Sequence, residues 1–111
     1  MTDTMERQGT EPVLPIGSVV RLHPQGGLAM IAGRAALSRQ NGRQGYFDYV
    51  AVPYPDGVPE PDEYLFFNRE DVYEVEYFGY INADEQVFAE NYDDLIAKAG
   101  YPKLSIPQDR Q

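Results

Sequence analysis

The stretch FFNREDVYEVEYFGYIN, residues 66–82, crowds aromatic and acidic side chains together with a single basic residue. Its first two residues end a short apolar run, 64–67, which predicts a strand. Asn68 is a good N-cap, and acids follow it where a helix dipole favours anions, so one helical turn is predicted over 69–72. From residue 73 the period becomes two, which indicates a half-buried strand whose inner face carries Tyr73, Val75 and Tyr77.

Three further strands are expected on the N-terminal side of this stretch. Residues 18–22 and 28–37 are rich in apolar side chains and are separated by a Pro/Gly turn, so they predict a hairpin. Gly33 is the expected bulge or bend of its second strand. The segment 38–45 reads as a polar loop that contains an Asn-Gly turn signal, and residues 46–54 are the third strand.

A helix is expected on the C-terminal side. Asn82 or Asp84 is its N-cap, Lys98 lies in its last turn, and Gly100 is the C-terminal signal. Its apolar side chains fall at helical spacing, and they are Val87, Phe88, Tyr92, Leu95 and Ile96.

The fold class predicted from these elements is α+β, with about five short strands and one C-terminal helix. Strands of this length and spacing favour a strongly bent antiparallel sheet or a small open barrel, with an ordinary α+β sandwich as the competing architecture. The expected organisation is a disordered leader over 1–12, a single β-rich domain over 13–100, and an irregular tail over 101–111.

Composition restricts the compartment and the chemistry. The chain has 111 residues and no cysteine, which excludes disulfides, thiolate metal sites and cysteine catalysis. Its N-terminus has no apolar segment typical of a signal peptide, and no apolar run approaches the roughly 20 residues needed to cross a bilayer. We therefore expect a soluble, cytoplasmic protein that does not bind membranes.

Charge is divided unequally along the chain. Residues 1–55 hold four acids and five arginines, a net charge of +1, whereas residues 56–111 hold fourteen acids and four basic residues, a net charge of −10. Such an acidic half repels phosphate backbones and attracts basic partners. A nucleic-acid-binding barrel would need a basic stripe, for which only the first-half arginines 21, 34, 39 and 43 are available.

We find no catalytic constellation and expect no enzyme activity, no cofactor and no metal. His23 is the only histidine and sits in a Pro/Gly turn, without a nucleophile motif such as GxSxG. The glycines do not form a phosphate loop. Asp48 is isolated in an apolar strand, and we expect its carboxylate to bind a turn amide or an arginine. With so many acids, a carboxylate pair for hydrolysis can be drawn anywhere and carries no specificity.

The acidic, tyrosine-rich second half is instead interpreted as a protein-binding surface. The proline-stiffened loop 56–63 and the acids that follow it would steer a basic partner, and tyrosines on either side of the loop would anchor it. The candidate residues are Tyr54, Asp56, Glu60, Asp62, Glu63, Tyr64, Glu70, Glu74 and Glu76.

Four linked motifs give the chain a family resemblance. IGSVV (16–20), MIAGR (30–34), FDYVAVPYPDG (47–57) and FFNREDVYEVEYFGY (66–80) are similar to a small bacterial family of formally unknown function, with the pattern LPIGSVV, MIxGR, YDYxGxxYPEG and FFNxEDIxxVxxxGY. The resemblance covers about residues 13–96. It departs at 51–53, where the family more often has a glycine and small residues. Members are encoded in type VII secretion gene clusters, often beside LXG-type toxins.

The resemblance implies a small cytoplasmic accessory protein, a chaperone or targeting adaptor that binds a secreted effector before export. It supplies no catalytic residues. The partner would be a protein, for example a basic segment of a secreted toxin. The alternative is an immunity protein that blocks a toxin catalytic domain, since small acidic proteins are suited to covering cationic clefts.

Overall fold

A long β-hairpin is the central element of the fold. The computed structural model describes residues 11–106. Strands β2 (Leu28–Gln40) and β3 (Arg43–Tyr54) pair along their whole length. They are joined by Asn41 and Gly42 alone, both with positive φ, as a tight two-residue hairpin turn requires. The predicted loop 38–45 is therefore wrong in extent, because this turn lets the ladder continue to its last residue on each side.

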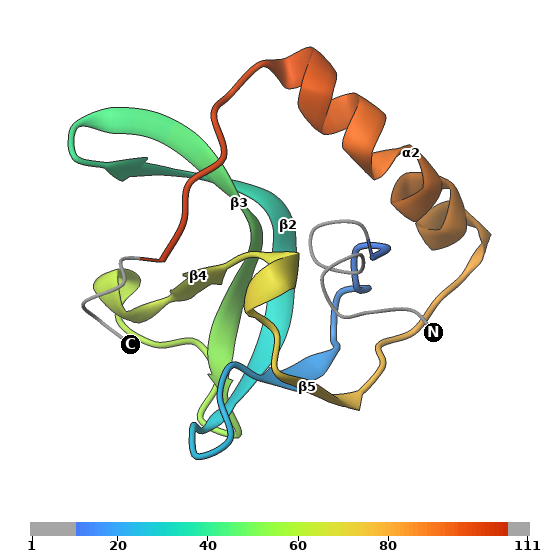
Figure 1. Ribbon diagram of the computed structural model, residues 1–111. Coiled ribbons are helices and arrows are strands. Elements are labelled where there is room, and N and C mark those ends of the chain that lie inside the picture. Colours follow the sequence, from blue (N-terminus) through green and yellow to red (C-terminus); the bar gives the residue numbers. More distant parts are fainter. Residues whose placement is uncertain (1–10, 107–111) are drawn as a thin grey trace, which may run out of the picture.

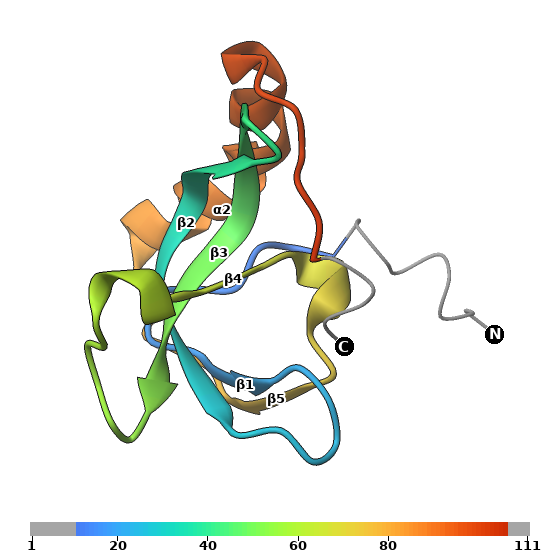
Figure 2. The ribbon, with the colours of Figure 1, turned by 90° about the vertical axis from the view of Figure 1, so that its left-hand side faces the viewer.

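Five antiparallel strands form one sheet in the order β4-β3-β2-β1-β5. Strand β1 (Val19–Arg21) pairs with β2, while β4 (Leu65–Phe67) and β5 (Glu74–Tyr77) lie at the two edges. A register shift between Ile31 and Gly33 bends β2 where a bulge was predicted. Figures 1 and 2 show the resulting strongly bent sheet. The predicted α+β class, with five strands and a C-terminal helix, is confirmed, and the sheet is not closed.

Helix α2 (Ala83–Ala99) lies to one side of the β2–β3 hairpin (Figure 1) and contributes Tyr92 to the core. The Asn82 side chain accepts a hydrogen bond from the Glu85 N–H at 2.9 Å, so Asn82, and not Asp84, is the N-cap. Gly100 ends the helix in the left-handed conformation. Tyr92 is buried in a core cluster with residues of every strand except β5. Of the predicted apolar face, Phe88 and Ile96 pack against this cluster, whereas Val87 and Leu95 are exposed.

The segment after α2 returns to the sheet. The Tyr46 N–H donates to the Pro102 carbonyl at 3.0 Å, and the Leu104 N–H donates to the Tyr46 carbonyl at 2.8 Å. Leu104 is buried by this contact, and Figure 1 shows the segment descending from the helix across β3. At the other end of the chain, Val13 already belongs to the core. Residues 1–10 of the predicted leader and 107–111 of the predicted tail lie outside the described residues.

Candidate protein-binding surfaces

A buried carboxylate on β3 connects the sheet to the rest of the molecule. Asp48 is fully buried and accepts hydrogen bonds from the Arg69 backbone N–H at 3.0 Å and the Tyr92 hydroxyl at 2.9 Å. The Arg69 Nε lies 3.3 Å and the Lys103 Nζ 3.4 Å from its Oδ2. The prediction that Asp48 binds a turn amide or an arginine is confirmed, and it binds both.

Asn68 extends this network. It was predicted to cap a helical turn, and the short 3-10 helix η2 (Arg69–Asp71) does begin after it. Its side chain is used over longer range, however: the Oδ1 accepts from the Asp48 N–H at 2.9 Å, and the Nδ2 donates to the Leu104 carbonyl at 2.7 Å. Among residues 11–106, every buried side-chain N or O atom has a hydrogen-bond partner. The hydrogen-bonding capacity of the buried side chains in this cluster is therefore used by other groups of the protein.

Electrostatics in the cluster follow from burial and pairing. Burial alone would raise the pKa of Asp48, but the hydrogen bonds from Arg69 and Tyr92 and the nearby positive charges outweigh it, so this pKa is lowered. Burial, followed by the charge of Asp48, raises the pKa of Tyr92. Burial also raises the pKa of Asp71, against the lowering effect of the Asn68 N–H that it accepts. Asp48 therefore stays ionised, with its charge balanced inside the fold.

Catalysis or metal binding would need histidine or carboxylate side chains to lie together. His23 is exposed in the turn between β1 and β2. Within the described part of the chain, no three histidines or carboxylates are grouped as metal ligands, and no helix is long and apolar enough to cross a membrane.

The acidic loop, residues 56–63, precedes β4 at one edge of the sheet. It includes a 3-10 turn, η1 (Pro61–Glu63). Its four carboxylates are exposed, and none forms an ion pair with another described residue. Of the flanking tyrosines, Tyr54 is 44% exposed and Tyr64 is half-buried. The loop thus offers uncompensated negative charge to solvent.

The other predicted acids lie elsewhere. Glu70, in η2, pairs with Lys103 at 3.0 Å. Glu74 and Glu76 lie on β5, at the opposite edge of the sheet from β4, and Glu76 pairs with Arg21 at 2.9 Å. The candidate residues therefore form two groups, one at each edge strand, with Glu70 between them in sequence.

A strip of exposed aromatic side chains begins just before β5 and continues past its end. The sequence did not predict that these side chains are exposed. Only Val75 of the predicted inner face packs against the core, while Tyr73 and Tyr77 are 58% and 65% exposed. The prediction is wrong for these two because β5 is a four-residue edge strand, and its ends extend past the core. We define the 73–81 strip by its exposed members, which are Tyr73, Tyr77, Phe78, Tyr80 and Ile81.

The strip is held by a close backbone contact. Gly79 lies against the Ile16 carbonyl so tightly that a Cβ would not fit, and its N–H donates to the Ser18 hydroxyl at 3.0 Å. This contact keeps the chain after β5 beside the segment that leads into β1. A glycine inside an aromatic run was the available signal, although it does not reveal which side chains become exposed.

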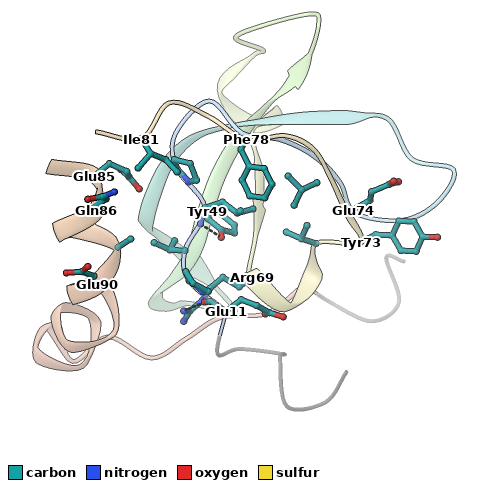
Figure 3. A pocket seen from close by; sticks show the side chains of 17 residues that line it. Glu11, Tyr49, Arg69, Tyr73, Glu74, Phe78, Ile81, Glu85, Gln86 and Glu90 are labelled. Carbon is teal, nitrogen blue, oxygen red and sulfur yellow. Dashed lines mark hydrogen bonds between the residues drawn. The ribbon is translucent and has the colours of Figure 1, made fainter. Parts of the chain in front are cut away.

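A groove of about 760 Å³ lies between β5 and α2. Figure 3 shows its two walls, with Tyr73, Glu74 and Phe78 on one side and Glu85, Gln86 and Glu90 of α2 on the other. Between them lie the N-terminal segment 11–15 and Tyr49, whose hydroxyl accepts the Leu14 N–H at 2.8 Å. The α2 wall is fixed to the sheet, because Arg34 of β2 forms a two-bonded ion pair with Glu85.

The chain was compared with known proteins. One family model matches residues 13–88, and its description is "Domain of unknown function (DUF4176)". No curated protein and no solved structure matches the chain.

Proposed function

Because this chain belongs to the DUF4176 family, whose description gives no activity, we propose from its surfaces that it is a non-enzymatic protein-binding module, a chaperone or targeting adaptor for a type VII-secreted effector. The resemblance to proteins encoded beside LXG-type toxins supports the choice of partner class.

The exposed 73–81 strip is the observation that carries this proposal. Its five side chains are between 49% and 82% exposed and fall within a stretch of nine residues, 73–81. Large apolar patches on small proteins mark interaction sites, and burying one such side chain contributes about 1.5–3 kcal/mol. A partner that covers the strip would gain this free energy.

The acidic loop supplies the second component. Its four exposed carboxylates form no ion pair among residues 11–106, so their charges face solvent. Such a field accelerates association with a basic partner and weakens as salt screens it. The loop would therefore steer the encounter, while Tyr54 and Tyr64 bury area.

Co-purification with the N-terminal export domain of an LXG-type toxin tests the proposal. Reversing Asp56, Glu60, Asp62 and Glu63 to Lys should slow association by at least about tenfold and make the rate rise with salt, because salt then screens a repulsion. The matched control carries Asn or Gln at the same positions and should show an intermediate rate, which separates lost attraction from new repulsion. Unchanged binding after the reversal would reject the loop as the contact face.

The immunity-protein alternative differs in the toxin segment that binds. The charge of −10 over residues 56–111 is suited to covering a cationic cleft. Binding to the C-terminal catalytic domain with loss of its activity would favour immunity. Binding to the export domain, with catalysis intact, would favour chaperoning.

A further inference from the structure

Strand β5 has an open edge beside the groove. It pairs with β1 on one side only, and the sheet order places it last. The groove is lined by residues 72–75, which include the start of β5, and by no residue of β1. Unpaired strand edges next to pockets accept extended peptides, whose backbones extend the ladder while alternate side chains fill the pockets.

The groove is apolar where such side chains would enter. Its apolar lining comes from three separate segments, namely Val13 and Leu14, then Val72, Val75, Phe78 and Ile81, then Ala89. Phe78 and Ile81 also belong to the exposed strip and are 59% and 49% exposed. An occupant would therefore bury part of the strip as well as the groove.

The charges on the two walls of the groove indicate which sign of charge its occupant should carry. Arg69 is held by Asp48 and Asp93, and Glu85 is held by Arg34. Glu74 on the β5 wall and Glu90 on the α2 wall are exposed and form no ion pair with any other residue of 11–106. A carboxylate on each side favours Lys or Arg next to the apolar side chains of the occupant.

The same charges disfavour a second copy of this chain. Two β5 edges paired with each other would bring Glu74 and Glu76 against the same residues of the copy, and like charges on paired strands are destabilising. Charged side chains on edge strands are a common protection against self-pairing.

We infer that the groove beside β5 binds an extended partner segment that alternates apolar and basic side chains and adds a strand to β5. This inference rests on the proposed protein-binding function and specifies the site and the chemistry of the segment that it recognises.

A defined peptide tests the inference. The probe is an eight-residue peptide with blocked ends that alternates Val and Lys, added to the full chain and followed by NMR and amide hydrogen exchange. We expect shifts in residues 72–78 and slower exchange of the β5 amides. A version with Glu in place of Lys, and one N-methylated at alternate backbone positions, should each bind at least about tenfold more weakly. No binding at millimolar peptide, or binding that N-methylation leaves unchanged, overturns the inference.

Charge-reversal variants locate the site. Glu74→Lys combined with Glu90→Lys should weaken peptide binding at least about tenfold, whereas Asp94→Lys, at an exposed position of α2 that does not line the groove, should leave it unchanged. A larger loss of peptide binding in the control variant than in the groove variant would overturn the groove as the binding site. So would dimers of the free chain paired through β5, or cross-relaxation showing that residues 1–10 already fill the groove.

The two proposals fail separately. If the export domain binds the Glu74→Lys, Glu90→Lys chain as well as the unmodified chain, the proposed function stands and the groove is overturned. If the peptide binds at β5 but no export domain is captured, the groove stands and the proposed partner is rejected.

Discussion

At the scale of single residues, Asp48 shows how a carboxylate can occupy an apolar strand. An isolated buried charge is too costly, so each of its oxygens is bonded: Oδ1 by Tyr92, Oδ2 by Arg69 with Lys103 nearby. These three partners come from α2, η2 and the C-terminal segment. A single side chain therefore makes the positions of three elements depend on one another.

Replacing Asp48 by Asn should lower the free energy of unfolding by about 3 kcal/mol, because it leaves Arg69 and Lys103 beside an uncharged group. Urea denaturation measures this change. The control, Asp93→Asn, removes another partner of Arg69 whose side chain is 69% exposed, and should cost about 1 kcal/mol or less. Equal effects of the two variants would contradict the central role of Asp48.

The pH dependence of the same variant has a defined sign. The pKa of Asp48 is lowered on folding from its ordinary value of 3.8, so its ionised form stabilises the fold fully above pH 3.8. This contribution is lost as the pH falls through the folded pKa. The stability difference between the unmodified chain and Asp48→Asn should therefore shrink below pH 3.8. Urea titrations at several pH values check it, and a constant difference would argue against the assignment.

The sequence predicted that Asp48 would be paired, because a lone acid in a β-branched and aromatic strand needs a partner. It did not identify the partners, since Tyr92 and Lys103 are 44 and 55 positions away. Asn68 is the N-cap of η2, as predicted, but the long-range hydrogen bonds of its side chain were not predicted. Its position after an apolar run indicates a cap, and nothing local shows that its amide also bonds Asp48 and Leu104.

At the scale of elements, α2 was predictable because its start and end signals are local. Asn82→Ala should lower the free energy of unfolding by about 1 kcal/mol, since the Glu85 N–H would lose its acceptor. Thermal or urea denaturation measures it. Asp84→Ala removes only an anion near the helix N-terminus and should cost about 0.5 kcal/mol. A larger effect at Asp84 would reverse the assignment of the cap.

Strand β5 shows where periodicity fails. Its alternation was read correctly as a strand, but a two-residue period says only that two faces differ. Which face is covered depends on the neighbours, and β5 has a neighbour on one side only. The candidate surface was therefore predicted in part: the acidic loop is exposed as expected for its composition, whereas the aromatic strip and the groove depend on long-range packing.

At the scale of the whole molecule, the segment after α2 clamps the helix to the sheet. Leu104→Ala should lower the free energy of unfolding by about 2–4 kcal/mol, because the side chain is buried between this segment and β3. Leu95→Ala, the same change at a half-exposed position of α2, should cost about 1 kcal/mol or less. Chemical denaturation measures both. Similar losses would show that the segment does not hold the fold.

The clamp also bears on how the chain folds during its synthesis. Strand β3 leaves the ribosome well before α2, yet the Asp48 carboxylate has its full set of partners only when residues up to Lys103 are present. Until then the carboxylate lacks the Tyr92 hydroxyl and the Lys103 ammonium group, and the apolar face that α2 covers is exposed. Folding of this domain is thus tied to the translation of the segment that follows α2, and the emerging hairpin is the state that needs protection from aggregation.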